Sequence, residues 1–315
     1  MKRAKPIYVE LDMKTDMDHL WAHTQQPDKH EQWDLRFSEI RYLPKTSPGA
    51  QHFRYMTRIG FGLRIEGSGE TKERFDVRTG ERVSTLRFGS EQRASLIREG
   101  RGYWKYVPQD GRIVFLTQYD YDTRFGSAGK IFDRYVFRPL MGYATAWSFD
   151  ALRIWLERGI VPAITIERAL IHYGSVMLLA ALWTYEGLVP KLLMPGGGEL
   201  ELMLQTGWFP GRETNVLTWM GIAEIGMAAA VFVFHRHKRL FAAQGLLLGM
   251  LAAAAFVANP ELLAAPFNPL TLSLPMIGLG WVASRTANNL PQAGRCRRRP
   301  VRRAERKVDG HGVHL

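Results

Sequence analysis

The sequence predicts two domains of different class: an α+β helix-grip domain, in which an antiparallel sheet wraps a long C-terminal helix, and an all-α four-helix transmembrane bundle. Two patterns support this. Residues 1–159 alternate apolar and polar side chains in short runs separated by glycine, proline and aspartate. Residues 169–284 carry four long apolar runs joined by short connections. The mean hydropathy of -0.18 averages the two halves and hides the change between them.

The four apolar runs are long enough to cross a bilayer, because a hydrocarbon core of ~30 Å takes about 20 apolar residues of α-helix. Buried helices of a large soluble core are the alternative, but the runs have hardly any polar face. Prolines in the last run are typical of membrane helices, where neighbouring helices satisfy the freed carbonyls. The predicted spans are 169–189, 216–234, 240–258 and 262–284.

Lysine and arginine gather in alternate connections, which predicts the orientation of the spans. The connection 235–239 is basic, as are the segment before the first span and the segment after the last one. We therefore expect a multi-pass protein of a bacterial-type inner (plasma) membrane with both termini in the cytoplasm. Residues 1–14 have no apolar run of signal-peptide length, so the first domain is expected to stay cytoplasmic.

The domain boundaries are expected at 1–159, 160–286 and 287–315, the last being a basic, disordered cytoplasmic tail. We interpret this tail as a topology signal that also touches anionic lipid headgroups, and we expect no nucleic-acid partner. The single cysteine, Cys296, excludes an internal disulfide and a CxxC redox pair. The basic residues of the tail are Arg295, Arg297, Arg298, Arg299, Arg302, Arg303, Arg306 and Lys307.

The first domain is predicted to be a meander of hairpins with helices at its two ends. Residues 7–14 alternate as a half-buried strand, Asp16 is an N-cap for a short helix, and 30–34 form another helical turn. Pro139 begins a helix that ends at Gly159. The strands between are predicted at 37–43, 52–60, 63–74, 82–89, 95–107 and 112–123.

This order of elements resembles the START-like superfamily, also called polyketide-cyclase-like or SRPBCC domains, over residues 5–159. The local resemblance lies in residues 17–21 and 27–34, an entry helix followed by a proline and then Trp33. It implies an apolar ligand cavity between the sheet and the long helix. It does not imply an enzyme, because many members only bind or carry hydrophobic molecules.

Strand alternation and helical spacing predict which side chains face such a cavity. A packed aromatic core without a ligand is the alternative, and it stays open. Asp120 and Asp122 share a strand face beside Arg124, a pattern more typical of a solvated edge than of acid–base chemistry. We predict no catalytic residue and no metal site. The predicted ligand-binding residues are Tyr55, Phe88, Tyr119, Tyr121, Tyr143 and Trp147.

The second half resembles the DoxX-like family over residues 164–284. The resemblance rests on residues 185–193, with Pro195 and Gly207 after them, and on 221–225 in the second span. The family takes its name from a subunit of a thiosulfate:quinone oxidoreductase. Because no residues suggest haem, iron–sulfur or flavin binding, we predict no cofactor and leave only quinone open.

Charged residues inside the spans are the main functional signal of the second half. Glu224 lies near mid-span, where an ionisable side chain costs ~2.5–3.5 kcal/mol to insert. We predict an intramembrane polar cluster of Glu186, Lys191, Glu224 and His172. A structural clamp between the first two spans and a ligand or proton site both remain open.

Two functional hypotheses follow. The first is a membrane-anchored binding or transfer protein that holds a hydrophobic small molecule (a lipid, a quinone or a polyketide-like compound) in a cytoplasmic START-like cavity. The second is an accessory subunit of a membrane quinone-linked oxidoreductase that acts through the DoxX-like bundle. The expected partners are the bilayer and the hydrophobic molecule; a membrane oligomer and enzymatic activity are left open.

Overall fold

The computed structural model describes residues 4–45, 49–196, 198–264 and 268–300. It divides into two compact units. The first, which we call the α+β unit, comprises Met1–Ala163 together with Pro291–Leu315. The second, the helical unit, comprises Ile164–Leu290.

The α+β unit is built on one seven-stranded antiparallel sheet with the order β1-β7-β6-β5-β4-β3-β2. Strands β2 to β7 form a meander, and β1 closes the order by pairing with β7, with Leu11 opposite Phe115. The strands are β1 (Ile7–Met13), β2 (Glu39–Tyr42), β3 (Gln51–Gly60), β4 (Leu63–Phe75), β5 (Arg82–Gly89), β6 (Ile97–Gln109) and β7 (Arg112–Thr123).

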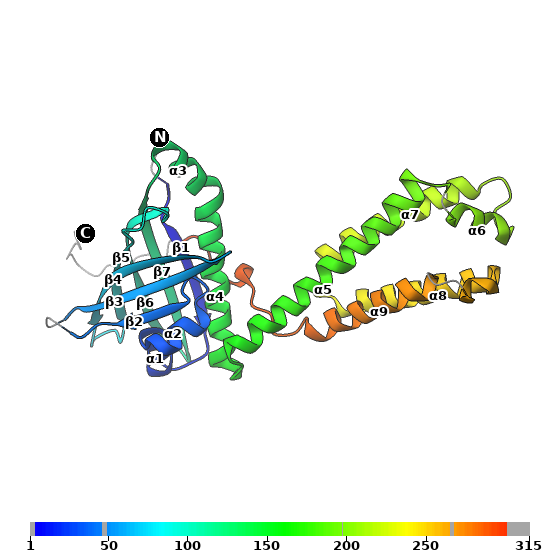
Figure 1. Cartoon of the computed structure of the whole chain (residues 1–315). Helices are drawn as coiled ribbons and strands as arrows, with labels where there is room; N and C mark the ends of the chain where they lie inside the picture. Colours follow the sequence, from blue (N-terminus) through cyan, green and yellow to red (C-terminus); the bar gives the residue numbers. More distant parts are fainter. Residues whose placement is uncertain (1–3, 46–48, 197, 265–267, 301–315) are drawn as a thin grey trace. The chain divides into compact units, whose positions relative to one another are not determined.

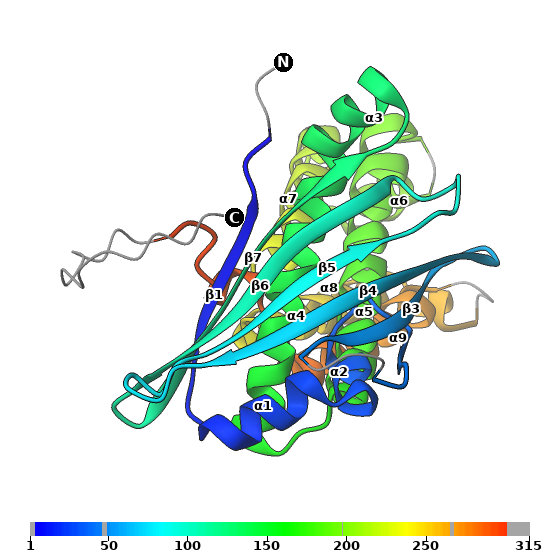
Figure 2. The same cartoon turned by 90° about the vertical axis from the view of Figure 1, so that its left-hand side faces the viewer.

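The helices of this unit lie at the two ends of the meander, and the predicted helix-grip class is confirmed (Figures 1 and 2). α1 (Met17–Gln25) is capped by Asp16, whose carboxylate accepts from the His19 N–H at 2.7 Å, and α2 (Pro27–Trp33) begins with a proline. The long helix α4 (Arg138–Arg158) ends at Gly159, whose φ of 67° is the left-handed conformation that glycine adopts most easily.

One helical stretch differs from the prediction. Helical structure before α4 already starts with α3 (Gly126–Phe132) and continues through a π-helical turn, η1 (Asp133–Phe137). Pro139 falls in the first turn of α4, where its missing N–H costs little, so the proline does not mark the start of the helical run. The prediction that helix begins only at Pro139 was wrong.

Aromatic side chains fill the space between α4 and the sheet. Phe115 of β7 and Phe149 of α4 are fully buried, and their rings stack with centroids 4.4 Å apart. Trp33 of α2 is also fully buried and packs edge-on against Phe149 at 6.1 Å. Burial of large side chains is the main stabilising term of such a core, at ~25 cal/mol per Å² of apolar surface.

The segment after the last long helix was expected to be disordered, and residues 291–300 are not. Arg297 exchanges both backbone hydrogen bonds with Glu10 at 3.0 and 2.9 Å, so the segment extends the free edge of β1. Asp150, buried in α4, accepts from the Gln292 N–H at 2.8 Å. Cys296 is buried and its thiol donates to the Ala146 carbonyl at 3.2 Å. An unpaired strand edge and a buried carboxylate both require such partners. The other basic residues of the predicted tail, Arg302, Arg303, Arg306 and Lys307, lie outside the described residues.

The helical unit contains four long helices. Among the described residues, three are long and apolar enough to cross a membrane: α5 (Pro162–Leu188) with the π-turn η2 (Val189–Leu193), α7 (Glu213–Val233) and α8 (Lys238–Ala258). The fourth, α9 (Pro269–Thr286), is shorter than the predicted run from 262, because Asn268 caps it with hydrogen bonds from the N–H groups of Leu270 and Thr271. Two short helices, α6 (Glu199–Thr206) and the 3-10 helix η3 (Pro260–Ala264), complete the unit.

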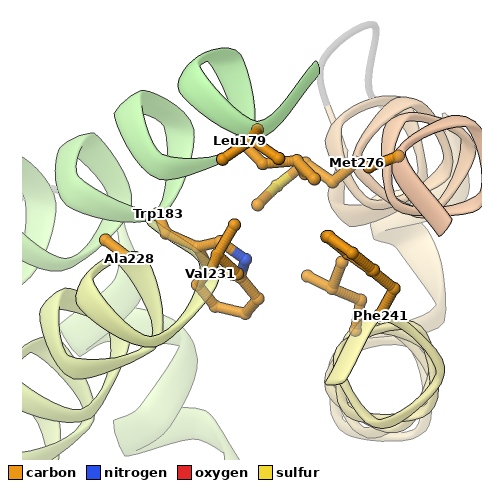
Figure 3. Close-up of a cluster of buried hydrophobic side chains, with 9 residues drawn as sticks. Leu179, Trp183, Ala228, Val231, Phe241 and Met276 are labelled. Carbon is orange, nitrogen blue, oxygen red and sulfur yellow. The ribbon is translucent and has the colours of Figure 1, made fainter. Parts of the chain in front are cut away.

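The helical unit buries a small core and leaves large apolar side chains outside. Leu179 and Trp183 of α5, Val231 of α7 and Met276 of α9 meet in one cluster (Figure 3). On the outer surface Trp219, Leu246 and Trp281 remain more than 65% exposed. A helix that is apolar on all sides is typical of a protein whose solvent is lipid.

Candidate functional site

The α+β unit contains a small cavity between the sheet and the helices that follow β1. Its volume is about 40 Å³. That is room for a few water molecules, whereas pockets for small organic ligands measure ~300–1,000 Å³. The apolar lining consists of Phe37, Ile40, Phe53, Leu86 and Trp104, and the polar lining of Thr24, Gln25, His30, Arg36, Tyr42, Thr71 and Ser84.

One wall of the cavity is a chain of neutral hydrogen bonds. The hydroxyls of Thr24 and Tyr106 lie 2.7 Å apart, and the Gln25 amide donates to the same Tyr106 oxygen at 2.9 Å. On the sheet side, the Thr71 and Ser84 hydroxyls lie 2.8 Å apart. Burial raises the pKa of Tyr106, so this wall stays uncharged at every physiological pH.

The opposite wall carries a buried ion pair from the irregular segment 34–38. Arg36 donates from Nε and Nη2 to the two carboxylate oxygens of Asp34, at 2.8 and 2.6 Å, and His30 Nε2 lies 3.0 Å from Asp34. Burial alone would raise the pKa of Asp34, but the charge and hydrogen bonds of Arg36, together with His30, hold it well below its usual range. The guanidinium also lies over the Tyr119 ring, 5.4 Å from its centroid. A neutral, fully bonded pair therefore faces the cavity.

None of the six predicted ligand-binding residues lines this cavity. Tyr119 is buried and its hydroxyl lies 2.8 Å from that of Thr145, while Tyr121 donates to Asp133 at 2.7 Å. Tyr55 is half-buried, donates to the Gly89 carbonyl at 3.2 Å, and its pKa is raised to about 12 by burial. Phe88 is half-buried and Trp147 is buried. These five aromatics belong to the unit's interior.

Tyr143 was wrongly expected to face inward: it is 53% exposed. The buried face of α4 at this level consists of the small residues Gly142, Thr145 and Ala146. At Gly142 even a Cβ would meet the Arg298 side chain at 2.2 Å. Small residues are needed where chain segments approach closely. A prediction that places the larger apolar side chain inside therefore chooses the wrong face of α4 at the level of Tyr143.

Arg36 and His30, the strongest polar groups at the cavity, were missed. Segment 34–38 is neither helix nor strand, so no periodicity indicates which side its residues face. The only signal in the sequence is the close spacing of Asp34 and Arg36. Asp120 pairs with Arg138 at 2.8 Å while Asp122 stays exposed, which leaves no carboxylate pair for acid–base chemistry.

The helical unit brings three of the predicted polar residues together around Lys191. This lysine, in η2, is only 5% exposed and lies 2.9 Å from a carboxylate oxygen of Glu224 and 2.9 Å from one of Glu199. It also donates to the backbone carbonyl of Glu186 at 3.2 Å. The pair forms because α5 and α7 cross at glycines: a Cβ at Gly187 would lie 2.5 Å from the Gly221 carbonyl oxygen.

His172 does not join that cluster, because 19 positions of helix separate it from Lys191, a rise of roughly 28 Å. It is fully buried elsewhere, with Nδ1 3.0 Å from the Ala283 carbonyl and Nε2 2.9 Å from Nδ1 of His235. Glu199, from the short helix α6, replaces it in the cluster. The sequence shows Glu199 only as one acid of a connection, so its partner could not be foreseen.

Residues 180–281 match the DoxX-like family. In solved structures, the chain is similar to a STAR-related lipid transfer protein from Xanthomonas axonopodis (14% identity, 48% of this chain and 85% of that chain, TM-score 0.39). It is also similar to the lipid transfer and protein localization domain of human StarD13 (10% identity, 44% and 73%, TM-score 0.34).

The fold and the apolar helices define the class: a membrane protein with a helix-grip α+β unit and a helical unit that matches the DoxX-like family over residues 180–281. The uncharacterized membrane protein YndG of Bacillus subtilis is 46% identical over 227 residues, which cover 72% of this chain and 76% of that protein. The chain belongs to the family of YndG.

Proposed function

We propose that the protein is a membrane-anchored binding or transfer protein for a hydrophobic small molecule, held in the cavity of the α+β unit. The observation that carries the proposal is the lining of that cavity, in which Phe37, Ile40 and Trp104 offer apolar surface beside the Arg36 guanidinium. Apolar walls with a few fixed polar groups are typical of small-molecule sites. The membrane spans supply a reservoir of such molecules.

The volume of the cavity sets a condition on this proposal. About 40 Å³ cannot hold a lipid or a polyketide, so a ligand must displace part of the wall. Segment 34–38, which carries Arg36 and Phe37, is the part of the wall that is neither helix nor strand. We propose that Phe37, which is half-buried, moves out when the ligand enters.

The test is to purify the full chain in mild detergent and identify co-purified small molecules by mass spectrometry. Leu86→Trp fills the cavity, and Thr85→Trp, at the exposed neighbouring position, is its matched control. We expect an apolar molecule on the wild type and on Thr85→Trp and its loss from Leu86→Trp. An apolar molecule retained equally by both variants would rule out this cavity as its site.

The second candidate is an accessory subunit of a quinone-linked membrane enzyme, acting through the helical unit. The buried Lys191 with Glu224 and Glu199 favours it, since intramembrane ionisable residues often mark ion or substrate sites. In the same experiment, quinone lost from Glu224→Gln but retained by Leu86→Trp would support this candidate and contradict the first.

We further propose that both termini face the cytoplasm, on the strength of the basic connections. Reporter fusions at the two ends and in the connection 207–212 are expected to give opposite readouts. A reporter that is active outside the membrane when fused at either terminus would refute this orientation.

A further inference from the structure

The turn between β3 and β4 exposes large apolar side chains. Phe61 is fully exposed, and Ile59 and Leu63 on either side are 63% and 61% exposed. Phe61 has a φ of 50°, and Gly60 and Gly62 also have positive φ. The backbone thus turns at three successive left-handed residues, and the Phe61 ring stands clear of the sheet. A buried role for this ring within the α+β unit is excluded by its exposure.

A second exposed apolar group lies on α3 and η1. Phe132, Tyr135 and Val136 are 50%, 70% and 49% exposed, and Phe125 and Ile131 are also more than half exposed. This stretch is firmly held. Asp133 is buried, accepts from the Tyr121 hydroxyl at 2.7 Å and from Arg138 Nε at 2.8 Å, and so fixes η1 against β7.

The two groups lie at the same end of the sheet. In the antiparallel meander, the β3–β4 turn, the β5–β6 connection and the exit of β7 into α3 share one end (Figure 2). We call the exposed side chains of 59–63 and 125–136 the apolar rim. At the other end, the β4–β5 turn exposes Val77 between Asp76 and Arg78, and Phe75 just before the turn is 54% exposed.

Within the two stretches of the apolar rim, the exposed charges have one sign. In residues 58–64 and 125–137 the exposed charged side chains are Arg58, Arg64, Lys130 and Arg134. The only acid of these stretches, Asp133, is buried. Arg64 has one partner, Glu66, at 3.5 Å in an exposed pair that contributes little. Aromatic and aliphatic side chains beside lysine and arginine are typical of segments that lie in a lipid interface.

We propose that the apolar rim inserts into the interfacial layer of the bilayer and that its basic residues contact anionic lipid headgroups. Groups of exposed large apolar side chains mark interaction sites, and the four basic side chains match the negative charge of an anionic lipid surface. Because the chain is a membrane protein, a bilayer is available to the α+β unit. The inference is independent of the cavity and goes beyond the proposed function.

The test uses the full chain with Cys296→Ser, reconstituted in nanodiscs of phosphatidylcholine with or without phosphatidylglycerol. An environment-sensitive fluorophore is attached at Phe61→Cys or at Phe132→Cys, with Val77→Cys as the matched control at the opposite end. We expect blue-shifted emission at 61 and 132 and quenching of about half of it by doxyl-labelled lipids, against water-like, unquenched emission at 77. Replacing Arg58 and Arg64 by Glu is expected to reduce the quenching at 132 in discs that contain phosphatidylglycerol.

Three outcomes would count against the proposal. Water-like emission at both rim positions would show that the rim is solvated. Blue-shifted emission without quenching by doxyl lipids would show that protein covers the rim, such as a second copy of the chain. Unchanged quenching after the charge reversal would overturn the role of the anionic headgroups. Circular dichroism of each labelled variant checks that the exposed substitutions leave the fold intact.

Discussion

Each unit holds a cation against a buried carboxylate, and the two cations are neutralised differently. In the α+β unit, Arg36 gives two parallel hydrogen bonds to the single carboxylate of Asp34. In the helical unit, Lys191 lies between two carboxylates, Glu224 and Glu199, each at 2.9 Å. The first arrangement balances its charge, and the second carries one more carboxylate than cation.

Because of this difference, the Arg36–Asp34 pair and the Lys191 cluster have different chemical capabilities. A bidentate arginine pair stays charged and fixed at any physiological pH, because arginine does not deprotonate in proteins. It can position a ligand but cannot exchange a proton. A lysine shared by two carboxylates is a point charge with rotatable donors, and one of the two carboxylates exceeds the charge of the lysine. Such a cluster can bind or release a cation or a proton. Under the proposed function, we expect ligand binding at the first place and ion-linked activity at the second.

The largest effect is expected from Lys191→Met, which leaves Glu224 buried without its cation. Loss of one partner of a buried ion pair costs ~3–5 kcal/mol, here at the upper end because two carboxylates then face each other. The melting temperature of the full chain in detergent, followed by fluorescence, should fall sharply. Adding Glu224→Gln to Lys191→Met should restore part of it; a double variant no more stable than the single one would contradict the ion-pair assignment.

Arg36→Met is expected to cost about 3 kcal/mol, less than Lys191→Met because His30 still faces Asp34. It should also reverse the pH dependence. In the wild type the pKa of Asp34 is lowered, so its contribution to stability is present above the unfolded pKa of 3.8 and is lost only in stronger acid. Without the guanidinium, burial raises that pKa, and stability then falls as the pH rises.

Thermal melts of the wild type and Arg36→Met at acidic and neutral pH measure this reversal. Arg41→Met, which removes an exposed arginine of β2, is the matched control and should leave the profile unchanged. Parallel pH profiles for wild type and Arg36→Met would show that the guanidinium does not control the Asp34 carboxyl.

A smaller effect on stability is expected from the hydrogen bond that holds η1, part of the apolar rim, against β7. Tyr121→Phe removes the hydroxyl that donates to buried Asp133, at a cost of about 1–2 kcal/mol. Arg138 still pairs with Asp133, so α3 and η1 should keep their place. A modest drop in melting temperature checks the bond, with Tyr135→Phe, an exposed ring, as control. Equal melting temperatures for the two variants would contradict a structural role for the Tyr121 hydroxyl.

The smallest expected effect is on the rate at which Cys296 reacts with a maleimide. Cys296 is buried and its pKa is raised to about 12, first by burial and then by Asp150, so maleimide labelling of the folded chain near neutral pH should be very slow. Asp150→Asn weakens the bond to the Gln292 N–H and the pairing with Arg153. Faster labelling of Cys296 in this variant is the expected result. Rapid labelling of the wild type would contradict the burial of the segment 291–297.

The sequence predicts what depends on period and composition. The strands, the α4 end at Gly159, the apolar helices and the proximity of Lys191 to Glu224 all follow from local patterns. Contacts made by irregular segments do not. Arg36 faces the cavity from a loop, and residues 291–297 return to β1 after the whole helical unit, so no local pattern indicates either. Tyr143 shows a further error, since at its level the packed face of α4 carries the small residues Gly142, Thr145 and Ala146 rather than large ones.

The return of residues 291–297 to β1 has a consequence for the order in which the protein is made. The edge of β1 and the site for Cys296 on α4 belong to the part of the chain synthesised first. Their partners emerge from the ribosome only after all the membrane helices. During translation the α+β unit therefore waits with an open strand edge, a feature that invites pairing with other chains. Closure of that edge can therefore come only after the last membrane helix has been synthesised, so a closed edge marks a chain that has been made past that helix.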